Sequence, residues 1–141
     1  MRKIFERWAA GDEVAPIGKL IGFRPHSYAV DHVTLEMEAG PQHANPMGTI
    51  HGGILCDIAD AAMGTAFGSG LEDGETMTTI ELKINFFRPV WNGLLRAEAH
   101  VVRRGKSVGY VECEIKDERG RLVAKAASTL MTLRGEKAAG R

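Results

Sequence analysis

A histidine and two glycines, His51-Gly52-Gly53, immediately precede a long apolar segment that we expect to be helical. The first N–H groups of a helix have no partner within the helix, and they carry a partial positive charge. Because glycine has no side chain, a ligand could approach these N–H groups closely. Such a site would stabilise an oxyanion that develops on a carbonyl group. Alternatively, the glycines form only a tight turn and His51 caps the helix.

Asp60 lies in the middle of the same predicted helix, about residues 53–69, where most other residues are apolar or small. A helix that is apolar nearly all round is expected to be buried, and burying a carboxylate costs free energy. Function is one reason to retain it, and a structural hydrogen bond is the other. Asp57 lies on much the same face near the helix start, where the helix dipole favours an anion. Asp60 is therefore the stronger candidate for a catalytic carboxylate.

The spacing of these groups limits how they could act together. Gly53 and Asp60 are seven residues apart, which corresponds to roughly 10 Å along a helix. One carbonyl group cannot easily contact both groups of the same chain. Two copies related by a two-fold axis remove the difficulty, because the helix start of one would lie near Asp60 of the other. If both groups are catalytic, the sequence predicts an obligate homo-oligomer with shared sites.

The chain before this helix favours one short helix and two strands. Residues 2–11 have the spacing of an amphipathic helix, and residues 18–28 and 31–38 favour extended structure. A segment rich in proline and glycine, 40–48, is expected to lead as a loop into His51.

After the helix, apolar and polar residues alternate, which is typical of strands with one buried face. The links between these strands are short, so we expect the strands to be antiparallel neighbours. The links are Arg88-Pro89 to Gly93, 104–106 and 117–120. The sequence thus predicts an α+β fold in which a long antiparallel sheet wraps one central buried helix, the hotdog arrangement. One domain is expected over residues 1–134, with a flexible tail at 135–141.

Composition narrows the function classes. The 18 basic and 18 acidic residues balance, which argues against a nucleic-acid partner. No segment approaches the apolar length of a membrane span, and the first residues lack a signal-peptide core, so a cytoplasmic protein is expected. No zinc-ligand spacing occurs, and we expect neither metal nor other cofactor. Cys56 and Cys113 are expected to be buried thiols, with a disulfide or a reactive thiol as the alternative. His32, His43 and His100 are expected on the surface or in loops.

Four motifs together resemble the phenylacetyl-CoA thioesterase-like family of hotdog thioesterases. They are Asn45-Pro46-Met47-Gly48, His51-Gly52-Gly53, Asp60-Ala61-Ala62-Met63-Gly64 and Thr79-x-Glu81-Leu82-x-Ile84-Asn85-Phe86-x-Arg88-Pro89. The likeness covers about residues 40–133. Its most specific feature is an aspartate nine residues after the histidine, with an asparagine six residues before it.

The resemblance implies hydrolysis of an acyl-CoA or aryl-CoA thioester. Asp60 matches the family's catalytic carboxylate, which acts either as a general base on water or as a direct nucleophile. Asn45 matches a residue that helps to hold the water. Thr79 matches a hydroxyl beside the carboxylate, although Thr78 could take that position if the preceding loop differs in length.

The resemblance also implies that two subunits share each site, in a dimer that is expected to pair into a tetramer. His51 and the amide of Gly52 or Gly53 match the groups that polarise the thioester carbonyl. The phosphates of CoA require cations, although charges in turns can equally well be simply solvated. The candidates for CoA binding are Arg88, Arg103, Arg104, Lys106 and Ser107.

Two other functions remain open at this point. A hotdog dehydratase acting on a hydroxyacyl thioester would need a histidine placed as base with an acid partner, which a mid-helix aspartate fits less well. A non-catalytic acyl-CoA binding module would use Asp60 to bind rather than to react. The release of free thiol from a panel of acyl-CoAs distinguishes a thioesterase from a dehydratase and from a binding module. The apolar residues of the helix fit an aryl pocket or an alkyl tunnel equally well.

Overall fold

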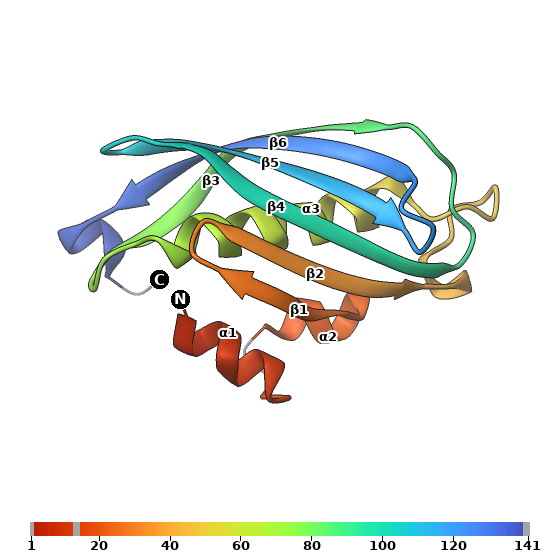
Figure 1. The fold of residues 1–141 in the computed structure, drawn as a ribbon, viewed down its shortest axis with the longest axis horizontal. Coiled ribbons are helices and arrows are strands. Elements are labelled where there is room, and N and C mark those ends of the chain that lie inside the picture. The colour runs from red at the N-terminus through yellow and green to blue at the C-terminus, as the bar shows by residue number, and fades with distance from the viewer. Residues whose placement is uncertain (1, 13–14, 140–141) are drawn as a thin grey trace.

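A curved antiparallel sheet packs around one long helix in the computed structural model, which describes residues 2–12 and 15–139 (Figure 1). The helices are α1 (Arg2–Ala9), α2 (Pro16–Ile21) and α3 (Gly52–Ser69), with short 3-10 turns η1 (Pro41–His43) and η2 (Gly135–Ala138). The strands are β1 (Phe23–Ala29), β2 (His32–Ala39), β3 (Thr76–Phe86), β4 (Gly93–Arg104), β5 (Val108–Asp117) and β6 (Leu122–Leu133).

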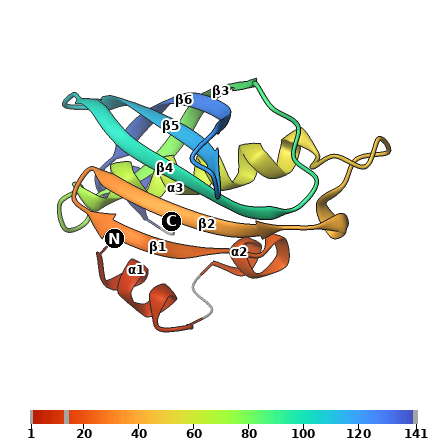
Figure 2. The same cartoon turned by 45° about the vertical axis from the view of Figure 1, so that its right-hand side comes forward.

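The six strands follow the order β1-β2-β4-β5-β6-β3, and all neighbours are antiparallel. Alternate residues of the central strands point toward α3 and are completely buried, as the period-2 pattern predicts. These residues include Leu95, Ala97 and Ala99 of β4 and Val111, Cys113 and Ile115 of β5. Figure 2 shows α3 running along the inner side of the curved sheet. The predicted hotdog architecture is therefore confirmed.

The helix α3 is buried on the side that faces the sheet and open on the other side. Its buried residues include Leu55, Ile58, Ala59, Ala62, Met63, Ala66 and Phe67. Asp57 and Asp60 are exposed on the open side. The expectation that Asp60 is buried is wrong for the single chain, because no described element covers this face of α3.

The chain before β1 differs from the predicted strand at 18–28. Residues 16–21 form the helix α2, with Pro16 in its first turn and Gly22 as a left-handed C-cap at φ 93°. The N–H of Gly22 donates to the carbonyl of Gly18 at 2.7 Å, which closes the helix. Proline at the start and glycine at the end are the residues that favour a short helix here.

The position of β3 also differs from the prediction that strands with short links are neighbours. β4 pairs with β2, whereas β3 pairs with β6 at the far edge of the sheet. The N–H groups of Phe87 and Arg88 donate to the carbonyl of Val123 and hold the end of β3 beside the start of β6. The next link crosses the start of α3, where the N–H of Ile50 donates to the carbonyl of Val90 at 2.7 Å.

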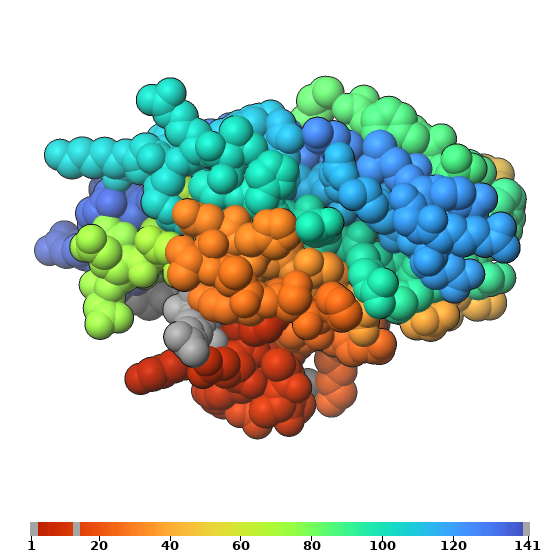
Figure 3. Space-filling view, viewed as in Figure 1, coloured from red at the N-terminus to blue at the C-terminus, as the bar shows by residue number. Residues whose placement is uncertain are grey.

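The N-terminal helix contributes Phe5 to the hydrophobic core, whereas the described C-terminal residues of η2 are not buried. The ring of Phe5 in α1 lies 4.8 Å from that of Tyr28, and Trp8 contacts Phe23 edge-on, so α1 covers β1. The tail expected from residue 135 begins with the exposed turn η2, and residues 140 and 141 lie outside the described part. Among the described helices, none has the length and apolar character needed to cross a bilayer. The space-filling view of Figure 3, drawn from the same side as Figure 1, shows a surface made mostly of strand residues, with α1 below them.

Candidate active site

His51 caps the start of α3 with its own side chain. Its backbone is extended, and its Nδ1 accepts a hydrogen bond of 2.9 Å from the N–H of Gly53. The N–H of Ile54 donates to the carbonyl of His51 at 3.0 Å. The N–H of Gly52 is left without a hydrogen-bond partner among the described residues. Since Nδ1 accepts, the proton of the neutral imidazole is on Nε2 and can be donated outward.

The two glycines of this turn leave space that two different neighbours occupy. A Cβ at Gly53 would lie 2.9 Å from Nδ1 of His51, so a side chain there would displace the capping ring. A Cβ at Gly52 would lie 2.9 Å from Cζ of Phe86, the last residue of β3. The glycines therefore make room for the histidine and for an aromatic ring from a distant strand. The first contact follows from a capping interaction that the sequence allowed, and the second depends on tertiary structure.

His43 fixes the loop that leads to His51. Its ring is buried, its Nδ1 accepts from the N–H of Gly40, and its Nε2 lies 2.7 Å from the carbonyl of Ile21. Because Nδ1 accepts, Nε2 must donate to that carbonyl. The carbonyl of His43 in turn accepts from the N–H of His51 at 2.8 Å. The prediction of a surface or loop histidine missed this buried structural role.

Asn45 closes the tight turn before His51. Its Oδ1 accepts from the N–H of Met47, and its Nδ2 donates to Oγ1 of Thr49, both at 2.9 Å. Its backbone also bonds to Thr49 and Gly48. The side chain is half-buried and retains one Nδ2 N–H for another acceptor.

Asp60 is held by a hydroxyl from β3. Oγ1 of Thr79 donates to Oδ1 of Asp60 at 3.0 Å, which supports the position predicted for Thr79 rather than Thr78. The pairing of β3 with β6 shifts register between Thr79 and Glu81, and the intervening Ile80 is half exposed. A bulge of this kind changes the direction of neighbouring side chains. This bulge lies next to Thr79, whose bond to Asp60 joins β3 to the open face of α3.

Asp57 and Cys56 lie one turn before Asp60. Partial burial and then the charge of Asp60 raise the pKa of Asp57 above its usual value. Burial, followed by the charges of Asp57 and Asp60, raises the pKa of the Cys56 thiol. Cys113 is completely buried, and burial raises its pKa to about 12. Both thiols are free, and the expectation of burial holds for Cys113, whereas Cys56 is partly exposed.

The two halves of the site are separate within one chain. Gly52 and Asp60 are eight residues apart on α3, which corresponds to about 12 Å along the helix. The helix is continuous between them, so their separation is fixed. The structure thus agrees with the spacing argument that a single carbonyl cannot contact both groups of one chain.

The residues predicted to bind CoA lie at opposite ends of α3. Arg88 is exposed on the link that crosses the helix start. Arg103, Lys106 and Ser107 are exposed at the turn between β4 and β5, where Arg104 contacts the last turn of α3. An 18-residue helix separates these ends by about 27 Å. The structure therefore does not bring all the predicted residues together in one chain.

Arg104 is engaged by the protein itself. Its Nη2 donates to Oδ1 of Asp31 and, at 2.7 Å, to the carbonyl of Phe67 in the last turns of α3. Its guanidinium lies 4.3 Å above the centre of the Phe67 ring. Its Nε and Nη1 are buried, so a phosphate cannot reach them. This geometry favours a structural role for Arg104 over phosphate binding.

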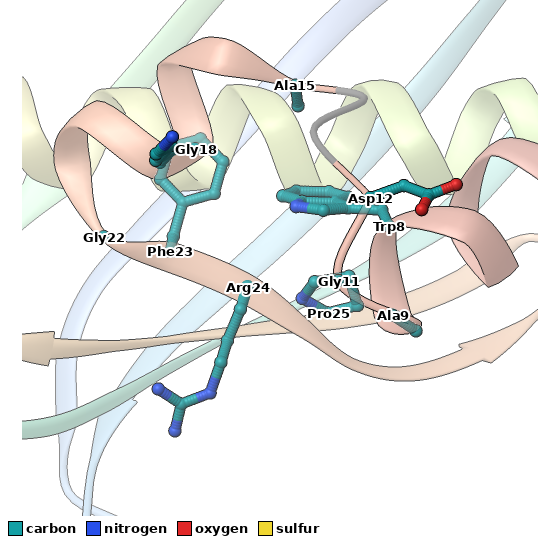
Figure 4. Close-up of a pocket in the computed structure, with 11 residues that line it drawn as sticks. Trp8, Ala9, Gly11, Asp12, Ala15, Gly18, Gly22, Phe23, Arg24 and Pro25 are labelled. Carbon is teal, nitrogen blue, oxygen red and sulfur yellow. The ribbon is translucent and has the colours of Figure 1, made fainter.

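A cavity of about 480 Å³ lies far from these groups, between α1, α2 and β1 (Figure 4). Trp8 and Phe23 form its aromatic wall, and Arg24 extends away from it. Arg24 is paired with Glu36 at 2.8 Å, and Asp12 with Arg7 at 2.8 Å. Two charged residues that line the cavity, Arg24 and Asp12, are therefore already in ion pairs. Thr79, which donates to Asp60, lies on β3 at the opposite edge of the sheet from β1, so this cavity is separate from the candidate site.

No group of three or more His, Cys, Asp or Glu side chains within residues 2–12 and 15–139 is arranged to hold a metal ion. The chemistry that the site can perform with its own groups is acid-base or nucleophilic. A carboxylate supported by a hydroxyl can activate water or attack a carbonyl, and a helix N-terminus can stabilise the resulting oxyanion.

Comparisons with known proteins show what the chain is similar to. A family model described as the thioesterase superfamily matches residues 47–124. A Saccharolobus solfataricus protein, provisionally named an esterase, is 40% identical over 87 residues, covering 62% of this chain and 61% of the relative. Mouse acyl-coenzyme A thioesterase 13 is 26% identical over 105 residues, covering 73% of this chain and 74% of the relative.

The solved structure of the Escherichia coli PaaI protein from the phenylacetic acid degradation operon is also similar, with a TM-score of 0.84 and 27% identity. The match covers 95% of this chain and 96% of that one. The chain spans only 61% and 59% of the length of two relatives, from S. solfataricus and Caenorhabditis elegans.

Proposed function

This chain belongs to the thioesterase superfamily, and from that premise we propose that it hydrolyses an acyl-CoA or aryl-CoA thioester to the free acid and CoA. The observation that carries the proposal is the hydrogen bond between Thr79 and Asp60 on the open face of α3. A carboxylate that is exposed and also oriented by a hydroxyl is suited to react with a substrate. The similarity to acyl-coenzyme A thioesterase 13 supports CoA as the leaving group.

The carbonyl of the thioester is polarised at the start of α3. The N–H of Gly53 is occupied by His51, so we assign the donation to the free N–H of Gly52, with Nε2–H of His51 as a second donor. Both donors lie at the N-terminus of α3, where the helix dipole makes the electrostatic potential positive. They stabilise the oxyanion more than the neutral carbonyl, which lowers the barrier to attack.

Asp60 supplies the carboxylate by one of two routes. As a general base it removes a proton from water, whose oxygen attacks the carbonyl carbon; the tetrahedral intermediate then releases the thiolate of CoA, which takes up the proton. As a nucleophile it forms an acyl-carboxylate anhydride and releases CoA, and water then cleaves the anhydride. In either route, Thr79 fixes one carboxylate oxygen, and Asn45 has a free N–H for the water.

Each complete site combines two copies of the chain. The start of α3 in one copy faces Asp60 of the second copy, and the two-fold axis generates a second identical site. The open face of α3 and the half-exposed Ile80 of the edge strand β3 provide the surface for this contact. The two helices then run antiparallel, so Arg88 of one copy and Lys106 of the other approach the same end. We propose that these cations, with Arg103 and Ser107, bind CoA.

Release of free thiol from a panel of acyl-CoAs tests the activity. We expect Asp60→Asn and Asp60→Ala to lower kcat by about 10³-fold or more while the oligomer persists in light scattering. Asp57→Asn is the matched control, since it removes a carboxylate from the same face, and it is expected to retain activity. Near-normal turnover of the Asp60 variants contradicts the proposal, and CoA binding without thiol release favours a binding module.

Mixing two inactive variants tests whether the sites are shared. In a heterodimer of Asp60→Ala and His51→Ala chains, one site carries both defects and the other carries neither. Random reassociation should therefore recover about a quarter of the wild-type activity. If each chain holds a complete site, mixing recovers none.

A further inference from the structure

The ring of Phe86 lies end-on against Gly52 at the start of α3. A Cβ at Gly52 would lie 2.9 Å from Cζ of Phe86 and 3.4 Å from both Cε atoms. Such distances are shorter than van der Waals contact, so a side chain at position 52 would displace the ring from this position. Phe86 is nevertheless 53% exposed, which means that much of the ring faces away from the protein's own atoms.

The direction of the ring follows from the alternation along β3. Leu82 and Ile84 are partly buried and pack against the core around α3. Phe86 is two residues further along the strand, so its side chain points to the same side. The row of inward-facing residues thus continues past the core to the helix start. Phe87, the next residue, is outside the strand and 60% exposed.

The contact places an apolar surface beside the proposed donor. A carbonyl oxygen that accepts from the N–H of Gly52 would lie about 3 Å from its nitrogen. The ring of Phe86 occupies the space that a Cβ at Gly52 would take. A substituent on that carbonyl carbon that extends toward the end of β3 would meet the ring at about 4 Å, which is contact distance for apolar groups.

We propose that Phe86 is a specificity-determining residue that forms one wall of the acyl subsite. This inference rests on the proposed thioester hydrolysis, and it names the side chain that limits the acyl group next to the reacting carbon. The ring stabilises flat or unbranched apolar acyl groups by contact and excludes groups that are branched at the α-carbon. Selectivity between acyl groups is then set by the shape of this wall.

The test compares kcat/KM of wild type, Phe86→Ala, Phe86→Leu and Phe87→Ala on acetyl-, isobutyryl-, hexanoyl-, benzoyl- and phenylacetyl-CoA. Phe86→Ala should raise the ratio of isobutyryl-CoA to acetyl-CoA by about tenfold or more, because it removes several ring carbons from the wall. Phe86→Leu should give an intermediate ratio. Phe87→Ala controls for the loss of an exposed aromatic residue and should leave the ratios unchanged.

The assignment is overturned if Phe86→Ala changes kcat/KM by the same factor for every acyl group. It is also overturned if Phe87→Ala changes the ratios between acyl groups as much as Phe86→Ala does. Dissociation constants of the corresponding non-hydrolysable acyl ketone analogues of CoA give the same ratios without turnover. If wild type releases no thiol but Phe86→Ala still changes the order of analogue binding, hydrolysis is refuted and the role of Phe86 stands. If thiol is released and the analogue ratios do not change, the role of Phe86 is refuted alone.

Discussion

Oγ1 of Thr79 donates a hydrogen bond of 3.0 Å to Oδ1 of Asp60, and this bond joins the edge strand β3 to the open face of α3. The two residues are 19 positions apart. Their contact occurs beside the register shift between Thr79 and Glu81 in the pairing of β3 with β6. The carboxylate is thus oriented before any substrate is present, which is the condition for efficient attack.

Replacing Thr79 by valine removes this bond and keeps the shape of the side chain. We expect kcat to fall about ten- to hundredfold, since a hydrogen bond to a charged group contributes about 1.5–3 kcal/mol. KM should change little if the bond acts on the carboxylate alone. Thr79→Ser keeps the hydroxyl and should restore most of kcat. Steady-state kinetics decides, and a Thr79→Val enzyme within twofold of wild type contradicts the role.

Replacing Gly53 by alanine tests the capping histidine. The new Cβ would lie 2.9 Å from Nδ1 of His51 and displace the ring, so kcat/KM should fall about tenfold or more. The helix should remain, because alanine is a better helix former than glycine. Circular dichroism verifies the fold. Unchanged kinetics with an intact helix would show that the capped position of His51 is not needed.

Cys56 reports on the arrangement of the proposed dimer. The midpoint of α3 between His51 and Asp60 lies at residues 55–56, so the two-fold axis should pass near Cys56. Packed helices lie about 8–10 Å apart, and a short rigid bismaleimide should therefore link two chains through this residue. Cys113 is buried with a pKa of about 12 and should not react.

Denaturing electrophoresis measures the cross-link. Cys56→Ser should abolish the cross-linked dimer, and unfolding before treatment should lower its yield. A cross-link that survives in Cys56→Ser, or its absence in a verified native oligomer, would exclude this position of the axis.

Asp57 should make stability depend on pH. Burial and the charge of Asp60 raise its pKa above the usual 3.8. Between the unfolded pKa and the raised native pKa, the native state therefore binds more protons than the unfolded state. The free energy of unfolding falls as pH rises through this interval. Asp57→Asn removes this loss, so it should stabilise the protein at pH 7 and give no gain below about pH 3. Urea unfolding at both pH values measures the difference, and a gain independent of pH refutes this origin.

Arg104 and Lys106 should separate stability from CoA binding. Arg104→Met removes the bonds to Asp31 and Phe67 and should lower the free energy of unfolding by about 1–3 kcal/mol. Lys106→Ala changes an exposed turn residue and should leave stability within about 0.5 kcal/mol while raising KM. Urea unfolding and kinetics on both variants test this. An Arg104→Met protein with unchanged stability and a raised KM would contradict the structural role and indicate that Arg104 binds CoA.

Much of the fold is determined by local patterns in the sequence. The alternation in β4, β5 and β6 specified antiparallel strands with one buried face, and the apolar segment of α3 specified the helix that they wrap. The distance between Gly52 and Asp60 follows from helix rise alone. Residue type and spacing therefore sufficed to single out Asp60 and the glycine turn as a candidate site, and the same spacing is the basis for the proposal that a second copy completes it.

Tertiary structure decided which residues meet. A short link did not make β3 a neighbour of β4, because β2 occupies that edge and β3 pairs with β6 instead. The ring of Phe86 occupies the space beside Gly52 from a strand 34 residues later, a distance in sequence that no local pattern encodes. Arg104 carries the same charge as its neighbour Arg103, yet its position against the end of α3 makes it structural. Local propensities depend on adjacent residues, whereas these contacts depend on which surfaces the folded chain brings together.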